Sequence, residues 1–346
     1  MLSDIKKYVS RYVRGRSEQK AKERMLMDAY SVFLNTGKTP DDAFMNFVEL
    51  YCASNGAFNE EFNRKIVRAN PPQPVSGNLS GVLGRFSTEE FASVNKNLNE
   101  DGYVTFEKKL SKEVCDKIYD YALKTPALIP PAYDKPLLYD PEKPIAEIYR
   151  FDRQDLVNDP EIQKLMMDPV LINVARNYLG SEPIFDFPAL WWTSAFNKDA
   201  SHEAAQLYHF DLDRVKWLKI FFYINGVSPD NGPHCYIKGS HRAGNKPAEL
   251  LKRGYARIPD SDLKKFYKEE DFIELSAEAG AVFAGDTKCW HKGKPLKKGH
   301  RLAMEFEYTS SMFVSNYPKL IVQQCSDEFR AFCKANQTYA SNIHFQ

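Results

Sequence analysis

The feature that most constrains the fold is a series of short apolar or alternating runs, separated by turn residues, that begins after residue 183. Runs of this length between turn signals are typical of β-strands. The eight runs span about 125 residues, which favours a barrel or a jelly roll. They are residues 184–187, 190–196, 206–213, 217–224, 234–237, 272–275, 281–284 and 302–309.

Residues 1 to about 70 show the apolar periodicity of helices instead. Leu2, Ile5, Val9 and Val13 recur at helical spacing, with lysines and arginines between them. An amphipathic helix of this kind usually packs its apolar stripe against its own domain. The alternative is a weak peripheral contact of residues 1–16 with an anionic membrane surface.

A linker separates this helical region from the strands. Proline and glycine cluster in residues 70–82 without periodicity. We therefore predict a helical N-terminal extension, residues 1–80, and one β domain with flanking helices, residues 81–346. Residues 243–270 interrupt the series of strands, and we predict a partly helical insertion there, which is either a lid or a pair of ordinary charged surface helices.

Three further helices are predicted from their end signals. The first covers residues 41–52, after a Thr-Pro pair. The second starts after Ser111, which is a favourable N-cap, and runs to about residue 123. The third covers residues 160–178 and ends at Gly180, a favourable C-terminal glycine.

Composition excludes several classes of protein. Lys and Arg number 47 and Asp and Glu 46, so a net charge of +1 argues against a nucleic-acid partner. The six cysteines form no CxxC pair and no zinc-knuckle spacing, which indicates reduced thiols. No secretory signal and no apolar run of membrane-spanning length is visible. We therefore expect a cytoplasmic, globular protein.

One short segment carries a metal-binding pattern. His209 and Asp211 are two residues apart in a predicted strand, so both point to one face and Phe210 points to the other. His-x-Asp alone is weak evidence, because such pairs occur by chance and a strand histidine is more often a core residue. His291 can supply a third ligand. Two histidines and one carboxylate on one face leave three coordination positions open, which suits an oxygen-activating Fe(II).

An arginine follows the third ligand. Arg301 opens the last predicted strand, ten positions after His291. Beside a metal it could clamp the distal carboxylate of 2-oxoglutarate with a two-pronged hydrogen bond. Phe221 and Phe222 lie on the strand after the His-x-Asp pair, and we expect Phe221 to face the cofactor. The following aromatics either wall the substrate or belong to the core: Trp191, Trp192 and Phe196.

Other polar residues near these motifs are weaker candidates. Asp213 falls on the same face as His209, where it is an acceptor for the site, a substrate contact or a surface residue. Five histidines lack an equivalent His-x-Asp or His-x-Glu partner, and we do not expect them to bind the metal: His202, His234, His241, His300 and His344.

With these motifs in place, the sequence resembles the phytanoyl-CoA dioxygenase family from about residue 90 to 315. Matching segments occur in the family's order. They are Leu-Asn-Glu-Asp-Gly-Tyr-Val at 98–104, Asp-Pro-Val-Leu at 168–171 through Leu-Gly at 179–180, His-Phe-Asp at 209–211, Ser-Pro-Asp-Asn-Gly to Gly-Ser-His at 228–241, Gly-Asp-Thr to His-Lys-Gly at 285–293, and Gly-His-Arg at 299–301.

The resemblance implies a double-stranded β-helix with Fe(II) held by His209, Asp211 and His291. Arg301 would anchor 2-oxoglutarate, and dioxygen would be the co-substrate. The implied reaction is hydroxylation of an aliphatic carbon in a small-molecule, carrier-linked or lipid-linked substrate, with release of succinate and carbon dioxide. Asp211 favours hydroxylation over halogenation, because related halogenases have Gly or Ala at this position.

Two departures leave the substrate pocket unassigned. Lys238 stands where the family often has proline before Gly-Ser-His, and residues 1–80 lie outside the match. Two other functions remain open. One is a cupin-type metalloenzyme that does not use 2-oxoglutarate, and the other is a non-catalytic metal-binding or assembly module.

Overall fold

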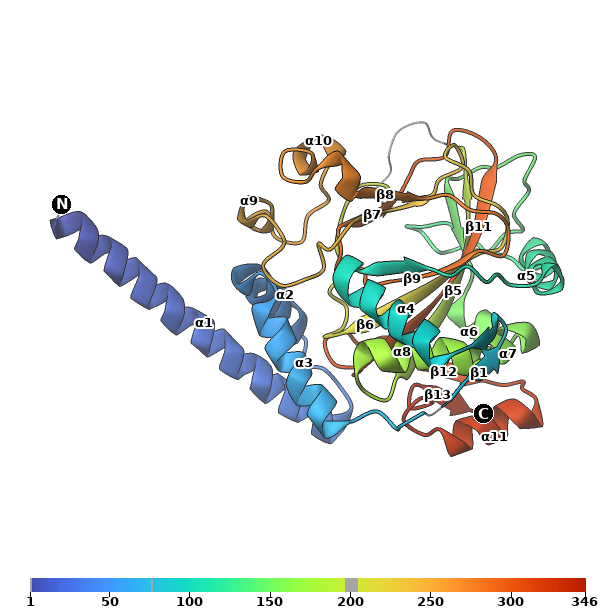
Figure 1. Cartoon of the computed structure of the whole chain (residues 1–346), viewed down its shortest axis with the longest axis horizontal. Coiled ribbons are helices and arrows are strands. Elements are labelled where there is room, and N and C mark those ends of the chain that lie inside the picture. Colours follow the sequence, from blue (N-terminus) through green and yellow to red (C-terminus); the bar gives the residue numbers. More distant parts are fainter. Residues whose placement is uncertain (1, 76, 197–204) are drawn as a thin grey trace.

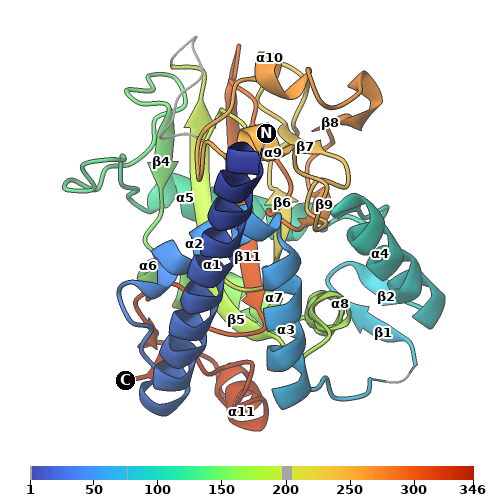
Figure 2. The same ribbon diagram turned by 90° about the vertical axis from the view of Figure 1, so that its left-hand side faces the viewer.

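The computed structural model describes residues 2–75, 77–196 and 205–346, with side chains from residue 17 onward. Three helices come first: α1 (Leu2–Thr36), α2 (Ala43–Ser54) and α3 (Ala57–Ala69). Helix α1 projects from the rest of the chain, and α2 and α3 lie between it and the β-rich part (Figures 1 and 2). The side chains of residues 1–16 lie outside the described residues, so the predicted membrane contact stays a prediction.

Two antiparallel sheets form the centre of the molecule. The larger has the strand order β3-β9-β6-β11-β5-β4, and the smaller has the order β10-β7-β8. The larger sheet contains β3 (Tyr103–Thr105), β9 (Val282–Gly285), β6 (Trp217–Tyr223), β11 (His300–Thr309), β5 (Ile184–Ser194) and β4 (Ile148–Arg150). The smaller contains β10 (His291–Gly293), β7 (His234–Ile237) and β8 (Phe272–Leu275).

The two faces of the larger sheet bury different cores. Phe221 and Phe283 point to the inner face, where they share a cluster with Tyr236 and Leu275 of the smaller sheet. Their neighbour Phe222 points outward into the main hydrophobic core. Alternation along each strand thus gives one face to the space between the sheets and the other to the helices. The predicted double-stranded β-helix is confirmed.

Helices cover the outer face of the larger sheet. They are α4 (Thr88–Asp101), α5 (Lys112–Lys124), α6 (Arg153–Val157), α7 (Pro160–Met166) and α8 (Pro169–Leu179). Ser111 caps α5 through its hydroxyl, as predicted, and Gly180 ends α8 in the left-handed conformation. The predicted helix 160–178 is wrong as a single element. Asp168 caps a new helix there, and Pro169 lacks the N–H that would continue the old one.

Two strand predictions also need correction. The two predicted strands 184–187 and 190–196 are one strand, β5, which runs through Pro188 and ends at Ser194. Residues 206–213 form no ladder strand and make only isolated bridges, at Tyr208 and His209. The segment stays extended because its partners are a loop and the short strand β10, so the side-chain alternation survives without a regular sheet.

Smaller elements complete the fold. The insertion at 243–270 contains α9 (Ala248–Leu251) and α10 (Asp260–Leu263), followed by a 3₁₀ turn at Glu269–Asp271. The remaining elements are β1 (Leu79–Gly81), β2 (Gly84–Phe86), β12 (Leu320–Val322), α11 (Asp327–Ala335) and β13 (Ile343–Phe345). Among the described residues, none of the helices has the length and apolar character needed to cross a bilayer.

The N-terminal helices share a hydrophobic core with the segment around residue 210. Phe47 and Tyr51 of α2 and Phe62 of α3 are buried in one cluster with Phe210 and Trp290. The ring centroids of Tyr51 and Phe210 lie 5.5 Å apart. Helices α2 and α3 therefore support the metal-ligand segment from behind. The predicted boundary near residue 80 stays a prediction.

Candidate metal centre

Backbone pairing brings the three predicted ligands together. His209 donates its N–H to the carbonyl of His291 at 3.0 Å, and His291 donates to the carbonyl of His209 at 2.8 Å. Asp211 donates its N–H to the carbonyl of Thr287 at 2.9 Å. The extended segment 209–211 is thus held against the chain that leads into β10, and all three side chains meet in one cavity.

Each imidazole is oriented by the backbone carbonyl of the residue two positions before it. The Nδ1 atom of His209 lies 2.9 Å from the carbonyl of Leu207, and that of His291 lies 3.0 Å from the carbonyl of Cys289. A carbonyl only accepts, so each Nδ1 carries the proton and each Nε2 keeps a free lone pair. The Nε2 atoms lie 3.8 Å and 3.7 Å from the carboxylate oxygens of Asp211.

These three side chains fit a metal ion. Their ligand atoms all lie within 4.8 Å of one another, and they are the one such group of His, Cys, Asp or Glu among the described residues. Burial lowers the pKa of His209 and of His291. Burial alone would raise the pKa of Asp211, but Lys219 and the two imidazoles outweigh it and lower that pKa. Neutral imidazoles and an ionised carboxylate are the protonation states that a metal requires.

Lys219 links the ligand carboxylate to two more acids. Its Nζ lies 3.2 Å from Asp211, 3.5 Å from Glu305 and 3.4 Å from Glu307. The contacts follow from register, because Lys219 on β6 is opposite Glu307 on β11 and Phe221 is opposite Glu305. These charged residues were missed from sequence. A lone lysine and two glutamates on the inner face of otherwise apolar strands are the signal that could have revealed them.

Arg301 lines the same cavity. Its side chain is 3% exposed, and its Nη atoms donate to the carbonyl of Gly232 and to the hydroxyl of Thr193. Its Nε has no hydrogen-bond partner. In the described part of the chain, no carboxylate lies within ion-pair distance of Arg301. A buried guanidinium with a spare donor beside a metal site can accept an anionic ligand.

The cavity has a volume of about 210 Å³ and is lined mostly by polar groups. Phe221 and Trp191 line it, whereas Phe222 and Trp192 belong to the core on the other face of the sheet. Phe196 is half exposed. Sequence reasoning also missed Arg150 and Arg257, which line the cavity. A larger hollow of about 550 Å³ between α6, α7 and β12 contains none of the three ligands.

The remaining polar candidates lie elsewhere. Asp213 does not line the cavity, and its carboxylate accepts a hydrogen bond from Tyr317. His234 lines the cavity next to Phe221, with ring centroids 4.6 Å apart, but belongs to no metal-ligating group in the described chain. His300 lies 3.1 Å from the hydroxyl of Tyr119, and His344 is exposed. His202 lies outside the described residues.

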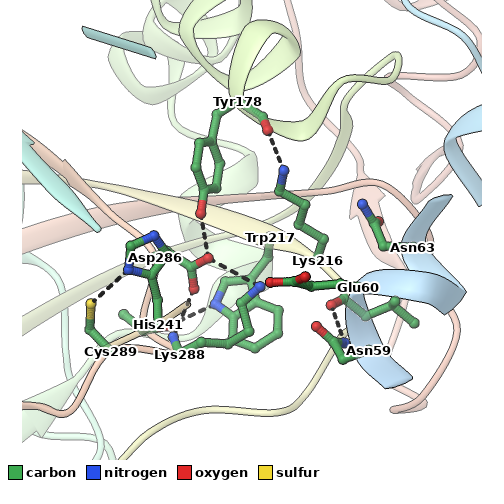
Figure 3. A network of polar contacts seen from close by, with 12 residues as sticks. Asn59, Glu60, Asn63, Tyr178, Lys216, Trp217, His241, Asp286, Lys288 and Cys289 are labelled. Carbon is green, nitrogen blue, oxygen red and sulfur yellow. Dashed lines mark hydrogen bonds and ion pairs between the residues drawn. The ribbon is translucent and has the colours of Figure 1, made fainter. Parts of the chain in front are cut away.

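A buried polar network anchors the loop that carries His291 (Figure 3). Asp286 is fully buried and accepts hydrogen bonds from the Tyr178 hydroxyl of α8 and from the backbone of Lys288. The ammonium of Lys288 lies 3.2 Å from the same carboxylate. His241 stands 3.6 Å from the sulfur of Cys289 in this network. The loop 286–290 is therefore fixed to the helical layer, which holds His291 in place.

Comparisons with known proteins agree with this geometry. A family model described as phytanoyl-CoA dioxygenase (PhyH) matches residues 98–301, which include all three ligands and Arg301. A search of curated proteins found no significant match.

Several solved structures resemble the chain weakly. HygX from Streptomyces hygroscopicus, with nickel and 2-oxoglutarate bound, is 15% identical and has a TM-score of 0.49, with 71% of this chain and 94% of that chain covered. EctD from S. alaskensis, in its apoform, is 18% identical and has a TM-score of 0.47, with 69% and 87% covered. AviO1 from Streptomyces viridochromogenes Tue57 is 15% identical and has a TM-score of 0.43, with 65% and 96% covered. At these scores the three structures add nothing to the assignment.

Proposed function

The chain belongs to the phytanoyl-CoA dioxygenase family, and from this premise we propose that it is an Fe(II)- and 2-oxoglutarate-dependent dioxygenase. We propose that it hydroxylates an aliphatic carbon of a small-molecule, carrier-linked or lipid-linked substrate. One oxygen atom of O2 enters the product and the other enters succinate, with release of carbon dioxide. One observation carries the proposal: the His209–Asp211–His291 triad and the buried Arg301, which has no acidic partner in the described chain, line one cavity.

The donor set supports iron as the metal. Two imidazole Nε2 atoms and one carboxylate on one face leave open positions for a bidentate 2-oxo acid and for dioxygen. When bound, Fe(II) supplies the oxygen activation that couples decarboxylation of 2-oxoglutarate to oxidation of the substrate. Lys219 keeps Asp211 ionised and donates a hydrogen bond to its Oδ2 atom. This contact favours coordination of the metal by only one oxygen of the carboxylate.

Arg301 is proposed to bind the distal carboxylate of 2-oxoglutarate. The hydroxyl of Thr193 and the carbonyl of Gly232 fix its guanidinium plane, so little rotamer freedom remains to be lost on binding. Phe221 lies on the same inner face and packs parallel to Phe283 at 4.8 Å between ring centroids. This pair forms an apolar wall beside the cofactor site and excludes water from it.

The type of oxidation is also part of the proposal. A carboxylate at Asp211 fills the position that a halide would need, so hydroxylation is favoured over halogenation. We further propose a cytoplasmic location, because all six cysteines are free thiols.

Spectroscopy without oxygen tests the proposal directly. Adding Fe(II) and then 2-oxoglutarate should produce a visible charge-transfer band, and His209→Ala should abolish it. Arg301→Gln should raise the 2-oxoglutarate concentration needed for half of the band by about 10-fold to 100-fold, because a charge-assisted pair is lost. The matched control Arg85→Gln, at an exposed position, should leave the titration unchanged.

Each rival function has its own result in the same experiment. A protein that binds Fe(II) but shows no band with 2-oxoglutarate is either a metalloenzyme that does not use this co-substrate or a non-catalytic metal-binding module. A protein that binds no metal fits only the non-catalytic assembly module. Either result overturns the proposed function.

A further inference from the structure

A histidine outside the metal triad lines the same cavity. His234 is the first residue of β7 and is 6% exposed. It is paired with Gly293 on β10, two residues after the ligand His291. It belongs to no metal-ligating group among the described residues. Its imidazole is therefore a polar group of the cavity wall without a role in holding the metal.

Aromatic neighbours fix the orientation of this ring. Its centroid lies 4.6 Å from that of Phe221 and 5.2 Å from that of Phe283. Tyr223 packs nearly parallel to it, with 28° between the ring planes and 5.9 Å between the centroids. The Nδ1 atom of His234 lies 3.3 Å from the hydroxyl of Tyr223. Nε2 is then the nitrogen that remains for the cavity, and it has no hydrogen-bond partner in the described part of the chain.

Arg301 is the charged group that acts most strongly on this imidazole. It donates a hydrogen bond to the carbonyl of Gly232, two residues before His234. Burial, followed by the positive charge of Arg301, lowers the pKa of His234 well below its ordinary value, so the ring is neutral. A neutral ring does not repel the guanidinium beside it, and the two can share one anionic ligand.

Arg301 alone does not fill the acceptor positions of a carboxylate, which lie on both of its oxygens. Its two Nη atoms are already engaged, one with the carbonyl of Gly232 and the other with the hydroxyl of Thr193. Its Nε is without a partner. The distal carboxylate of 2-oxoglutarate, the proposed ligand of Arg301, therefore has room for a second donor from the cavity wall.

Tyr223 allows His234 to be that donor. The Tyr223 hydroxyl accepts a hydrogen bond from the backbone N–H of His234 at 2.9 Å. Its own proton can go to the carbonyl of Leu275 at 3.1 Å or to Nδ1 of His234 at 3.3 Å. When it goes to Nδ1, the ring proton must lie on Nε2, because a neutral imidazole has one donor and one acceptor. An anion beside Nε2 favours this arrangement.

We propose that His234 is a second binding residue for the distal carboxylate of 2-oxoglutarate, to which it donates a hydrogen bond from Nε2 beside Arg301. Tyr223 is the positioning residue that keeps the ring proton on Nε2. The inference rests on the proposed function and adds a residue to its co-substrate site. It also gives a role to a histidine that the sequence excluded as a metal ligand.

Titration of two 2-oxo acids tests the inference. The Fe(II) protein is titrated without oxygen, and the charge-transfer band reports binding. One acid is 2-oxoglutarate, and the other is 2-oxopentanoate, which has the same metal-binding end and lacks the distal carboxylate. His234→Leu should weaken 2-oxoglutarate about 10-fold, because a hydrogen bond to a charged group is lost. The same variant should bind 2-oxopentanoate as the wild type does.

Two further variants separate the hydrogen bond from the packing of the ring. His234→Gln, whose amide can offer an N–H near the position of Nε2, should recover most of the affinity for 2-oxoglutarate. Tyr223→Phe keeps the stacked ring and removes only the hydroxyl, and it should weaken 2-oxoglutarate about 3-fold. His344→Leu, at an exposed position, should match the wild type with both acids.

The outcomes distinguish this inference from the proposed function. Unchanged affinity for 2-oxoglutarate in His234→Leu would overturn the inference. An equal loss for both acids would also overturn it, because His234 would then act on the metal end of the ligand or on the fold. Weaker binding of Fe(II) alone in His234→Leu has the same consequence. A wild-type protein without the band refutes the proposed function instead.

Discussion

His209 and His291 exchange both of their backbone hydrogen bonds, at 3.0 Å and 2.8 Å, so the two imidazole ligands face each other across an antiparallel bridge. Their ring centroids are 4.2 Å apart. The pairing uses backbone atoms alone. The position of the ligands is therefore independent of the imidazoles that would bind the metal.

His291→Ala should accordingly separate metal binding from folding. We expect the variant to remain folded without metal, because its backbone pair with His209 is unchanged. The wild type should gain about 2.7 kcal/mol of unfolding free energy when free metal is at 100 times its dissociation constant, and the variant should gain nothing. Urea unfolding with and without Fe(II) under anaerobic conditions measures both. His344→Ala, at an exposed position, should behave like the wild type, and equal metal stabilisation in His291→Ala would refute the ligand assignment.

The pair of ligands His209 and Asp211 was predictable because any extended backbone, in a sheet or not, points successive side chains to opposite sides. Residues 206–213 are not the predicted ladder strand, yet His209 and Asp211 still share a side and Phe210 packs behind them. The cationic walls of the cavity were not predictable. Arg150 and Arg257 lie far from the ligands in sequence, and only the pairing of β4 with β5 and of Ile258 with Tyr208 brings them to the site.

Lys219 should matter for stability as well as for the site. Lys219→Met leaves Asp211, Glu305 and Glu307 buried together without their shared cation. Removal of one partner from a buried ion pair costs about 3–5 kcal/mol, and we expect a loss of this size in the unfolding free energy of the metal-free protein. Urea unfolding at neutral pH measures it.

A double variant tests the cause of that loss. Adding Glu305→Gln to Lys219→Met removes one unpaired carboxylate and should recover part of the stability. Lys96→Met, at an exposed position, should change stability by less than about 0.5 kcal/mol. If the double variant is no more stable than Lys219→Met, lost packing and not uncompensated charge explains the effect.

Helix α2 offers a matched pair of substitutions. Phe47 is fully buried in the cluster that contains Phe210, whereas Met45, two positions earlier, is 57% exposed. Phe47→Ala should lower the unfolding free energy by about 3–5 kcal/mol through loss of burial and an internal cavity, and Met45→Ala by less than about 0.5 kcal/mol. Chemical unfolding followed by circular dichroism distinguishes them. Equal, small losses would show that α2 does not share a core with the metal-ligand segment.

The network behind His291 predicts a pH dependence. Burial lowers the pKa of His241 to about 4, and the nearby carboxylate of Asp286 offsets only part of that shift. The unfolded chain, with a histidine pKa near 6.5, therefore binds the proton more readily than the folded protein. The contribution of neutral, buried His241 to the unfolding free energy is therefore complete above about pH 6.5, and it is lost as the pH falls toward 4.

His241→Gln isolates this contribution from that of the other histidines. Between pH 7 and pH 5 the metal-free wild type should lose about 2 kcal/mol more unfolding free energy than the variant, because only the wild type has this proton to take up on unfolding. Urea unfolding at several pH values provides the comparison, with His344→Gln as the exposed control. The other buried histidines, among them His209 and His291, titrate alike in all three proteins and cancel in the difference. Parallel stability curves for the wild type and His241→Gln would mean that His241 is as easily protonated in the folded network as in the unfolded chain.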